Sequence, residues 1–274
     1  MTRLEDLRHP INIFVLSPPT IDILLKQHGH SLNVEGRFNA AMVFWELPVI
    51  PESWRRSMQA LDAVLCASPF IYSAFSFSCP GPLLVDAPVP TPLPAWEKAT
   101  REDFGLPDKG VIFLSAFEPW SDPKRKNIEG VIQAFCKASD THPDAWLVIK
   151  INGSDTSEIR TILAPYLPLF QSHPRIKVIL DAMPYTRALA LLDLCDVYIS
   201  LHRAEGFGLV PFEAMSLGKP VIATAWSGNM AYMNAHVACL VNYSLTEANG
   251  SVSVYKASMV SPGVQWAEPS VEEA

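Results

Sequence analysis

The chain has 274 residues, a formal net charge of −7, 18% charged residues and 49% hydrophobic residues. This composition is typical of a globular protein and excludes a mainly disordered chain. The acidic balance argues against nucleic-acid binding, which needs a basic surface. We also expect no transmembrane segment, because no apolar run reaches the ~18 residues that a membrane-spanning helix needs.

The cysteine pattern predicts a reducing compartment. The five cysteines are scattered, odd in number and fit neither a C-x-x-C pair nor a zinc-ligand spacing. The first residues, MTRLEDLRHPINIF, contain acidic residues and lack the long apolar region of a signal peptide. We therefore expect a cytoplasmic protein whose cysteines are mostly small buried hydrophobic residues. They are Cys66, Cys79, Cys136, Cys195 and Cys239.

The first third of the chain alternates short apolar runs with helical patterns. This order favours an α/β fold with a parallel sheet and right-handed crossovers. Ser68 and Pro69 supply the N-cap and first residue of one of these helices. We expect strands at Ile11–Leu16, Ala40–Trp45, Ala63–Ala67 and Leu83–Val85, and helices at Ile21–Gln27, from Pro51 to Leu61, and after Ser68.

A proline-rich stretch then predicts a connection between domains. Six prolines between Pro80 and Pro94 make this segment stiff and non-helical. We expect a partial N-terminal Rossmann-like domain over residues 1–95 and a second Rossmann-like domain over residues 96–274. The first has only about four strands, and the final PSVEEA has the pattern of the first turn of a helix. Both ends are therefore expected to lack elements.

The second domain is expected to contain a six-stranded parallel sheet. Its strands are predicted at Val111–Ala116, Trp146–Ile151, Ile176–Leu180, Val197–Leu201, Val221–Ala223 and Ala238–Val241. Helices are predicted at Asn127–Ala138, Thr156–Tyr166 and Tyr185–Leu192, with later ones starting near Val210 and Asn229. After Val241 the pattern fades into polar, Ser-rich sequence for which we expect no element.

The most informative segment follows the strand that starts at Val197. There Glu205-Gly206-Phe207-Gly208-Leu209 forms a Gly-containing loop before a helix with Pro211 in its first turn. Glycine allows close backbone approach to a ligand, and a helix N-terminus attracts anions. We therefore predict a diphosphate-sugar site, with Glu213 available for sugar hydroxyls. Alternatively, Glu213 only complements the helix dipole.

Three other polar groups are predicted to lie at the same edge of the sheet. Lys124-Arg125-Lys126 precedes the helix capped by Asn127, where three cations are unfavourable unless an anion binds; the alternative is a solvated basic patch. His202-Arg203 directly precedes the glycine loop, where Arg203 could reach a phosphate and His202 could instead be structural. Ser227-Gly228-Asn229 offers further N–H donors or an ordinary turn.

These residues resemble the GT-B glycosyltransferases, specifically the retaining glycosyltransferase family four of "group 1" type. The segment EGFGLVPFE fits that family's Glu-x7-Glu motif and is followed by the usual EAMSLGKPVIAT. The resemblance implies that Glu205 lies beside the donor sugar or leaving phosphate, that Glu213 binds the ribose, and that residues 206–209 contact the sugar and diphosphate. It also implies that Lys126 binds the diphosphate and that the base packs near Met183.

The sequence departs from the family pattern at two places. The family has an arginine about six residues before its lysine, whereas SAFEPWSDPKRK has none before Arg125, so Arg125 or Arg203 would have to replace it. A histidine often found near the reacting sugar is also absent. Trp45-Glu46 stands there, as in a branch with a Trp-Glu-Leu-Pro motif, which makes Glu46 a candidate catalytic residue.

The resemblance implies a transferase that moves a hexose from a nucleoside diphosphate sugar to a hydroxyl acceptor (a sugar, lipid or polysaccharide) with retention. We expect no cofactor and no metal, because Asp-x-Asp occurs nowhere. Glu205, Lys126 and Glu46 would be the catalytic residues. The alternatives are a non-catalytic nucleotide-sugar-binding fragment and, less favoured by the EGFG loop, a GT-B epimerase.

Overall fold

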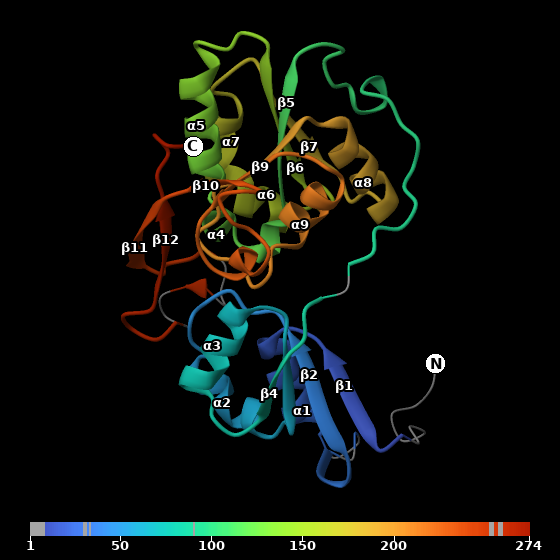
Figure 1. Cartoon of the computed structure of the whole chain (residues 1–274), viewed down its shortest axis with the longest axis vertical. Helices are drawn as coiled ribbons and strands as arrows, with labels where there is room; N and C mark the ends of the chain where they lie inside the picture. The colour runs from blue at the N-terminus through green and yellow to red at the C-terminus, as the bar shows by residue number, and fades with distance from the viewer. Residues whose placement is uncertain (1–8, 30–31, 33, 90, 252–254, 257–259) are drawn as a thin grey trace.

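The computed structural model describes residues 9–29, 32, 34–89, 91–251, 255–256 and 260–274. Within these residues the chain forms two parallel sheets and one small antiparallel sheet. Figure 1 shows the four-stranded parallel sheet in the lower part of the molecule and the six-stranded one in the upper part. We call residues 9–86 the N-terminal lobe and residues 111–241 the C-terminal lobe.

The N-terminal lobe has the predicted parallel sheet, with strand order β1-β2-β3-β4. The strands are mostly apolar, and each crossover between consecutive strands contains one α-helix. The predicted cap is confirmed, because the Ser68 hydroxyl accepts a hydrogen bond from the Ile71 N–H at the start of α3. The elements are β1 (Ile11–Val15), α1 (Pro18–His28), a 3-10 turn (Val34–Gly36), β2 (Phe38–Val43), α2 (Glu52–Gln59), β3 (Ala63–Cys66), α3 (Pro69–Ser78) and β4 (Leu83–Asp86).

The proline-rich connection runs along the outside of the molecule between the lobes (Figure 1). Its described residues 87–89 and 91–100 form no helix or strand, as predicted, and Pro90 lies outside the described residues. The first element after it is a 3-10 turn at Glu102–Phe104.

The C-terminal lobe has the predicted six-stranded parallel sheet, in the order β10-β9-β8-β5-β6-β7. Buried apolar side chains line both faces of this sheet, because helices cover both of them. Its strands are β5 (Val111–Phe117), β6 (Ala145–Ile151), β7 (Ile176–Leu180), β8 (Val197–Ser200), β9 (Val221–Thr224) and β10 (Cys239–Val241). Its helices are α4 (Pro123–Lys126), α5 (Ile128–Ser139), α6 (Ser157–Leu163), α7 (Leu167–Phe170), α8 (Tyr185–Leu194) and α9 (Leu209–Ser216), with 3-10 turns at Pro119–Ser121, Ala164–Tyr166 and Gly228–Ala231.

The polar C-terminal segment differs from the prediction. It contains strands β11 (Tyr243–Glu247) and β12 (Gln265–Pro269), which pair antiparallel. Most of β11 is exposed, so its sequence carries no run of buried residues from which a strand could be recognised. The last residues form a turn, and the helix expected near Asn229 is only a 3-10 turn.

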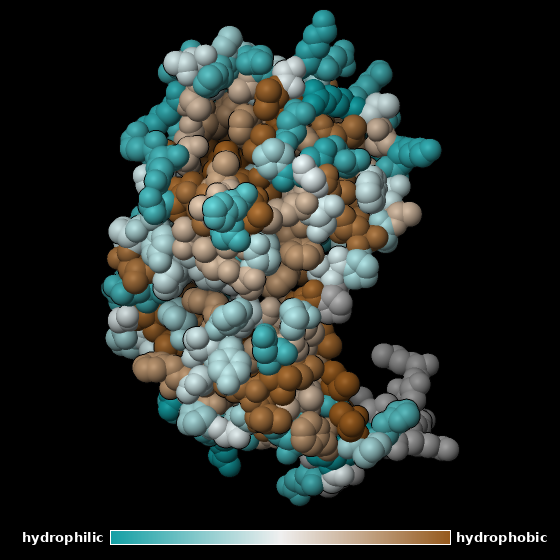
Figure 2. All heavy atoms as spheres, viewed as in Figure 1, coloured by the Kyte–Doolittle hydropathy of each residue, from teal (hydrophilic) through white to brown (hydrophobic). Residues whose placement is uncertain are grey.

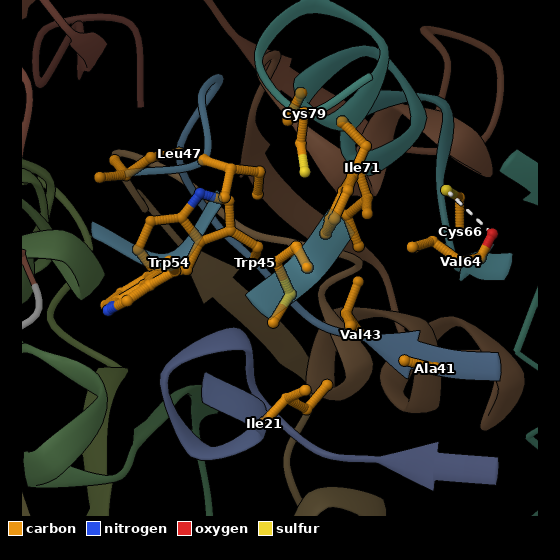
Figure 3. Packing of buried hydrophobic residues seen from close by; sticks show 14 of the residues in the cluster. Ile21, Ala41, Val43, Trp45, Leu47, Trp54, Val64, Cys66, Ile71 and Cys79 are labelled. Carbon is orange, nitrogen blue, oxygen red and sulfur yellow. Dashed lines mark hydrogen bonds between the residues drawn. The ribbon is translucent and has the colours of Figure 1, made fainter. Parts of the chain in front are cut away.

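A large hydrophobic cluster fills the N-terminal lobe and continues into the segment that contains β12. Figure 3 shows Ile21 of α1, Val43 of β2 and Ile71 of α3 directed into this cluster. Trp45 packs edge-on against Trp54, with ring centroids 5.1 Å apart, and stacks on Tyr255 at 5.8 Å. Further members from the end of the chain are Ala248, Val260, Val264 and Trp266.

Candidate active site in the cleft between the lobes

A cavity of about 530 Å³ lies where the carboxyl ends of β5, β6, β7 and β8 meet the N-terminal lobe. Figure 2 shows the surface hollowed between the two lobes on the right of the view. Parallel α/β sheets bind ligands at this edge. The cavity is lined by Phe44, Glu46, Leu114, Ala116, Phe117, Glu118, Ser121, Arg125, Lys126, Lys150, Asn152, Met183, Tyr185, Ala188, Leu189, Leu191, Leu192, Glu205, Gly206, Phe207, Gly208, Leu209, Val210, Pro211 and Glu213.

The predicted glycine loop forms one wall of this cavity. Gly208 is the N-cap of α9 and has a φ of 82°, a conformation that residues with a side chain rarely adopt. A Cβ atom on Gly208 would lie 2.8 Å from the Tyr232 hydroxyl, so the position also lacks room for one. The loop therefore brings the first N–H groups of α9, which have no partner within the helix, to the cavity wall.

A second turn holds this loop from behind. The Gly228 N–H donates to the Glu205 carbonyl at 2.8 Å, and the Glu205 N–H donates to the Ser227 hydroxyl, also at 2.8 Å. A Cβ atom on Gly228 would lie 2.0 Å from the Gly206 carbonyl oxygen, so only glycine allows this approach. Ser227 and Gly228 do not line the cavity, and their placement corresponds to positioning of the loop rather than to the predicted direct contact with a donor.

The Glu205 carboxylate lies between two cations. Lys126 forms an ion pair with its Oε1, and Arg125 Nη1 lies 3.3 Å from its Oε2. Burial would raise the pKa of Glu205, but Lys126 and Arg125 outweigh this effect and lower the pKa to about 2. Glu205 is therefore ionised at neutral pH and holds the Lys126 ammonium at the cavity wall.

Arg125 connects the two lobes. Its side chain is only 2% exposed, its guanidinium lies 3.9 Å from Glu46 Oε1, and it donates to the Ala204 carbonyl at 2.7 Å. Burial opposes its charge, but Glu46 and the neighbouring acidic groups raise its pKa, so it stays protonated. The Tyr255 hydroxyl donates to Glu46 Oε2 at 2.6 Å, and its ring lies under the guanidinium at 5.2 Å. Sequence reasoning missed Tyr255, because it lies in a polar segment without a motif.

The local structure around these cations corrects one step of the sequence argument. Asp122, with a φ of 74°, caps a separate short helix, α4, through its side chain. Lys124-Arg125-Lys126 therefore ends α4, and it also lies directly before α5, whose N-cap is Asn127 as predicted. Cations are favourable at a helix C-terminus, so their presence does not by itself require an anionic ligand.

Glu213 lines the far side of the cavity from α9, as predicted, together with Met183. The Tyr185 hydroxyl donates to Glu213 Oε1 at 2.7 Å. Burial raises the pKa of Glu213, which the bond from Tyr185 partly offsets, and burial and this bond raise the pKa of Tyr185 to about 12. Tyr185 was expected only as the first residue of a helix, although that helix starts at the ligand-binding edge of the sheet.

Lys150 is a second residue that sequence reasoning missed. It is 5% exposed near the end of β6, and its ammonium donates to the Asp181 carbonyl at 2.7 Å and to Asn152 Oδ1 at 3.1 Å. Burial lowers the pKa of Lys150. It ties the ends of β6 and β7 together just before Met183. A lysine inside the apolar run AWLVIKI was the available signal.

His202 and Arg203 are not among the cavity-lining residues, contrary to the predicted donor contact. His202 is fully buried beneath the loop, where it bonds to Ser200 and Asn229, and burial lowers its pKa. Arg203 instead forms two hydrogen bonds with Glu268 of β12, at 2.7 and 2.8 Å. The chain turns inward after β8, and so directs His202 under the loop and Arg203 toward the antiparallel sheet.

The fold defines a two-lobed α/β protein with a cavity at the carboxyl edge of its larger sheet, and the sequence comparison gives its family. Residues 98–251, more than half of the chain, match the family described as "Glycosyl transferases group 1", and the chain belongs to this family. No curated protein sequence matches it significantly.

Solved structures with the same fold include three glycosyltransferases. The pneumococcal O-GlcNAc transferase GtfA, in complex with UDP and GlcNAc, is 18% identical with a TM-score of 0.54 over 79% of this chain and 44% of its own. Anabaena HepE, in complex with UDP and glucose, is 15% identical with a TM-score of 0.60 over 85% and 64%. A trehalose-6-phosphate synthase studied for glycosyltransfer with retention is 12% identical with a TM-score of 0.56 over 86% and 63%.

These similarities establish the two-lobed GT-B fold that the sequence predicted. The chain spans less than two thirds of the length of each of these three relatives. In the described part of the chain, no helix has both the length and the apolar character needed to cross a membrane.

Proposed function

We propose that the chain transfers a hexose from a nucleoside diphosphate sugar to a hydroxyl acceptor with retention and without a metal ion. The observation that carries this proposal is the Glu205–Lys126 ion pair beside the α9 N-terminus, inside the cleft between the lobes. An ammonium and several backbone N–H groups on one wall of a cavity provide a site for a diphosphate.

The proposed donor contacts use predicted residues that line the cavity. The diphosphate would lie against Lys126 and the N–H groups of residues 206–209. The ribose hydroxyls would bond to the Glu213 carboxylate, with Tyr185 orienting it. The base would pack near Met183, on the segment that Lys150 fixes. The cavity volume of about 530 Å³ is within the range of small-molecule sites.

In the transfer step, the bond between the anomeric carbon and the phosphate oxygen breaks and negative charge develops on the leaving diphosphate. Lys126 and the loop N–H groups are fixed before the reaction, so they stabilise this charge without reorganising. Arg125 is covered by Glu46, Glu205 and Tyr255, and its role is to keep Glu205 ionised and the lobes joined. Glu46 faces the donor wall from the N-terminal lobe, where an acceptor hydroxyl would approach. We place this activity in the cytoplasm, in line with the cysteine pattern.

The diphosphate role of Lys126 is tested by comparing nucleoside diphosphates with nucleosides in calorimetric titrations. Lys126→Ala should weaken binding of the diphosphate far more than binding of the nucleoside, because only the diphosphate carries the charge that Lys126 meets. Lys124→Ala is the matched control, since Lys124 is an exposed neighbour outside the cavity. Equal losses for both ligands in Lys126→Ala would contradict a diphosphate contact.

The alternative is a chain that binds the donor without transferring sugar. Acceptor positioning is sensitive, since misplacement by about 1 Å can reduce the rate ~100-fold. A transfer assay run beside the titrations separates the two functions. Donor binding without transfer to sugar, lipid or polysaccharide acceptors would favour the alternative, and transfer that withstands a chelator would support the metal-free reaction.

A further inference from the structure

A second cavity, of about 480 Å³, lies on another side of the junction between the lobes. The antiparallel sheet β11–β12, which contributes to its wall, lies beside the junction on the left of Figure 1. No described residue lines both this cavity and the donor cavity. It is lined by Pro48, Val49, Ile50, Arg55, Phe77, Ser78, Trp226, Leu245, Ser261, Pro262, Gly263, Val264 and Gln265.

Two of these lining residues carry buried hydrogen-bond donors without a partner. Among the described residues, Arg55 Nε and Trp226 Nε1 are both buried and make no hydrogen bond. A buried polar group without a partner destabilises a protein, so such groups in a native structure mark strain or a ligand. Both residues line this cavity of ligand size, one from each lobe.

The polar chemistry of the cavity favours a ligand that accepts hydrogen bonds and carries negative charge. Arg55 is the only charged residue among the described residues that line it. Its other contact is an ion pair with the exposed Glu52, at 2.8 Å, which contributes little to stability. The Ser78 hydroxyl is already engaged, donating to Ala74 and accepting from Ile50. The partly exposed Arg55 guanidinium is therefore the cation that the described lining residues present, and guanidinium groups pair well with carboxylates and phosphates.

The aromatic residues of the cavity favour a flat ring on the ligand. The Phe77 side chain is 81% exposed, which is unusual for a large apolar residue beside a cavity. The Trp226 ring packs edge-on against Phe70 and at a tilt against Tyr243, with centroids at 5.8 and 5.2 Å. An exposed ring next to fixed N–H donors suits a sugar ring, which has both apolar C–H faces and polar substituents.

We propose that this cavity is a second binding site, for a hexose that carries an oxyanion, either a carboxylate or a phosphate. Arg55 binds the oxyanion, Trp226 Nε1 donates to a ring substituent, and Phe77 packs against the sugar face. The site is connected to the donor loop, because Trp226 precedes Ser227, which accepts a hydrogen bond from the Glu205 N–H. Its occupant can thus act as an effector of the transferase.

The test measures binding of glucuronic acid, glucose 6-phosphate and neutral glucose to the whole chain by ligand-observed NMR titration. We expect one or both acids to bind and glucose to bind at least tenfold more weakly. Arg55→Gln should weaken acid binding at least tenfold, and Trp226→Phe, which keeps a ring but removes the N–H, by a few fold. Arg56→Gln is the matched control, because Arg56 is the exposed next residue outside the cavity.

Lys126→Ala tests whether the acids bind in the donor cavity instead of this site, and it should leave acid binding unchanged. Thermal unfolding of each variant identifies a loss of fold, and Arg55 is partly exposed, so Arg55→Gln is expected to fold. Binding of only one acid would identify the oxyanion and support the proposal. The proposal is overturned if neither acid binds, if Arg55→Gln and Arg56→Gln bind equally well, or if Lys126→Ala abolishes binding.

Discussion

The hydrophobic cores of the two lobes are built from different parts of the chain. The described buried residues in the two clusters of the C-terminal lobe all lie between Phe104 and Val241, within the lobe's own strands and helices and the turn that precedes them. The cluster of the N-terminal lobe also contains Phe207 from the donor loop, and Tyr255, Val264 and Trp266 from the end of the chain. The hydrophobic core of the N-terminal lobe therefore includes residues from the second part of the sequence. The described buried residues in the core of the C-terminal lobe include none from the N-terminal lobe.

The edges of the two sheets differ in the same way. On the edge strand β1, Ile11, Ile13 and Val15 are 51, 65 and 61% exposed, so the face on which they lie is open. On β7, an edge strand of the C-terminal sheet, every residue is by contrast half-buried. Stability and donor binding should consequently respond differently to substitutions in the two lobes.

The largest effect is expected where the end of the chain supports the N-terminal lobe. Trp266→Ala should destabilise the protein by roughly 3–5 kcal/mol, because it removes a buried aromatic side chain and leaves a cavity. Unfolding in urea measures this loss. The matched control is Trp120→Ala, at a position that is 53% exposed, which should change stability by at most about 0.5 kcal/mol. Equal effects at both positions would refute the dependence of the N-terminal lobe on β12.

A smaller effect, on binding rather than stability, is expected within the C-terminal lobe. Glu213→Gln should weaken nucleoside diphosphate binding by roughly 1.5–3 kcal/mol through loss of a charged hydrogen bond. Glu129→Gln, on the exposed side of α5, provides the control. Calorimetric titration measures both, and unchanged affinity in Glu213→Gln would rule out the ribose contact.

The pH dependence of stability should reveal the Glu205 ion pair. Because the folded-state pKa of Glu205 is lowered from 4.5 to about 2, its ionised form stabilises the fold above pH 4.5, and this contribution is lost as the pH falls toward 2. In Glu205→Gln, the free energy of unfolding should fall less steeply between pH 4.5 and 2 than in the wild type. The difference in slope should be at most about 1.4 kcal/mol per pH unit. Urea unfolding at several acidic pH values measures the slope, and a slope like that of the wild type would contradict the pairing.

The smallest effect is expected on the open face of β1. Ile13→Thr should change stability by no more than about 0.5 kcal/mol, because the Ile13 side chain is mostly exposed and threonine keeps the β-branched shape that suits a strand. Urea unfolding provides the measurement. A loss of several kcal/mol would mean that this face is covered in solution.

Sequence reasoning predicted the parallel sheets because their strands are apolar runs separated by clear helix and turn signals, as in β7, whose bounds were predicted to the residue. It predicted the glycine loop because this pattern is local in the sequence: Gly208 ends the loop, and Glu213 follows in the next helix. It missed β11 because a mostly exposed strand lacks a buried pattern, and it missed β12 because the short segment QWAEP is buried only through contacts made by the fold. It also missed Tyr255, which meets Glu46 only through the fold, 209 positions apart. The inward turn of His202 depends on tertiary packing in the same way.

The Ser68 hydroxyl group joins the N-terminal lobe to the glycine loop, residues 205–209. Ser68 caps α3, and its Oγ–H also donates to the Gly206 carbonyl at 2.6 Å. Helix α3 has 10 residues and is therefore about 15 Å long. If the lobes rotate relative to each other and this bond is kept, the rotation axis passes near the N-terminal end of α3. The other end of α3 would then move while the glycine loop stays almost still. A rotation about this bond would change the width of the cleft away from the glycine loop and leave the loop itself in place.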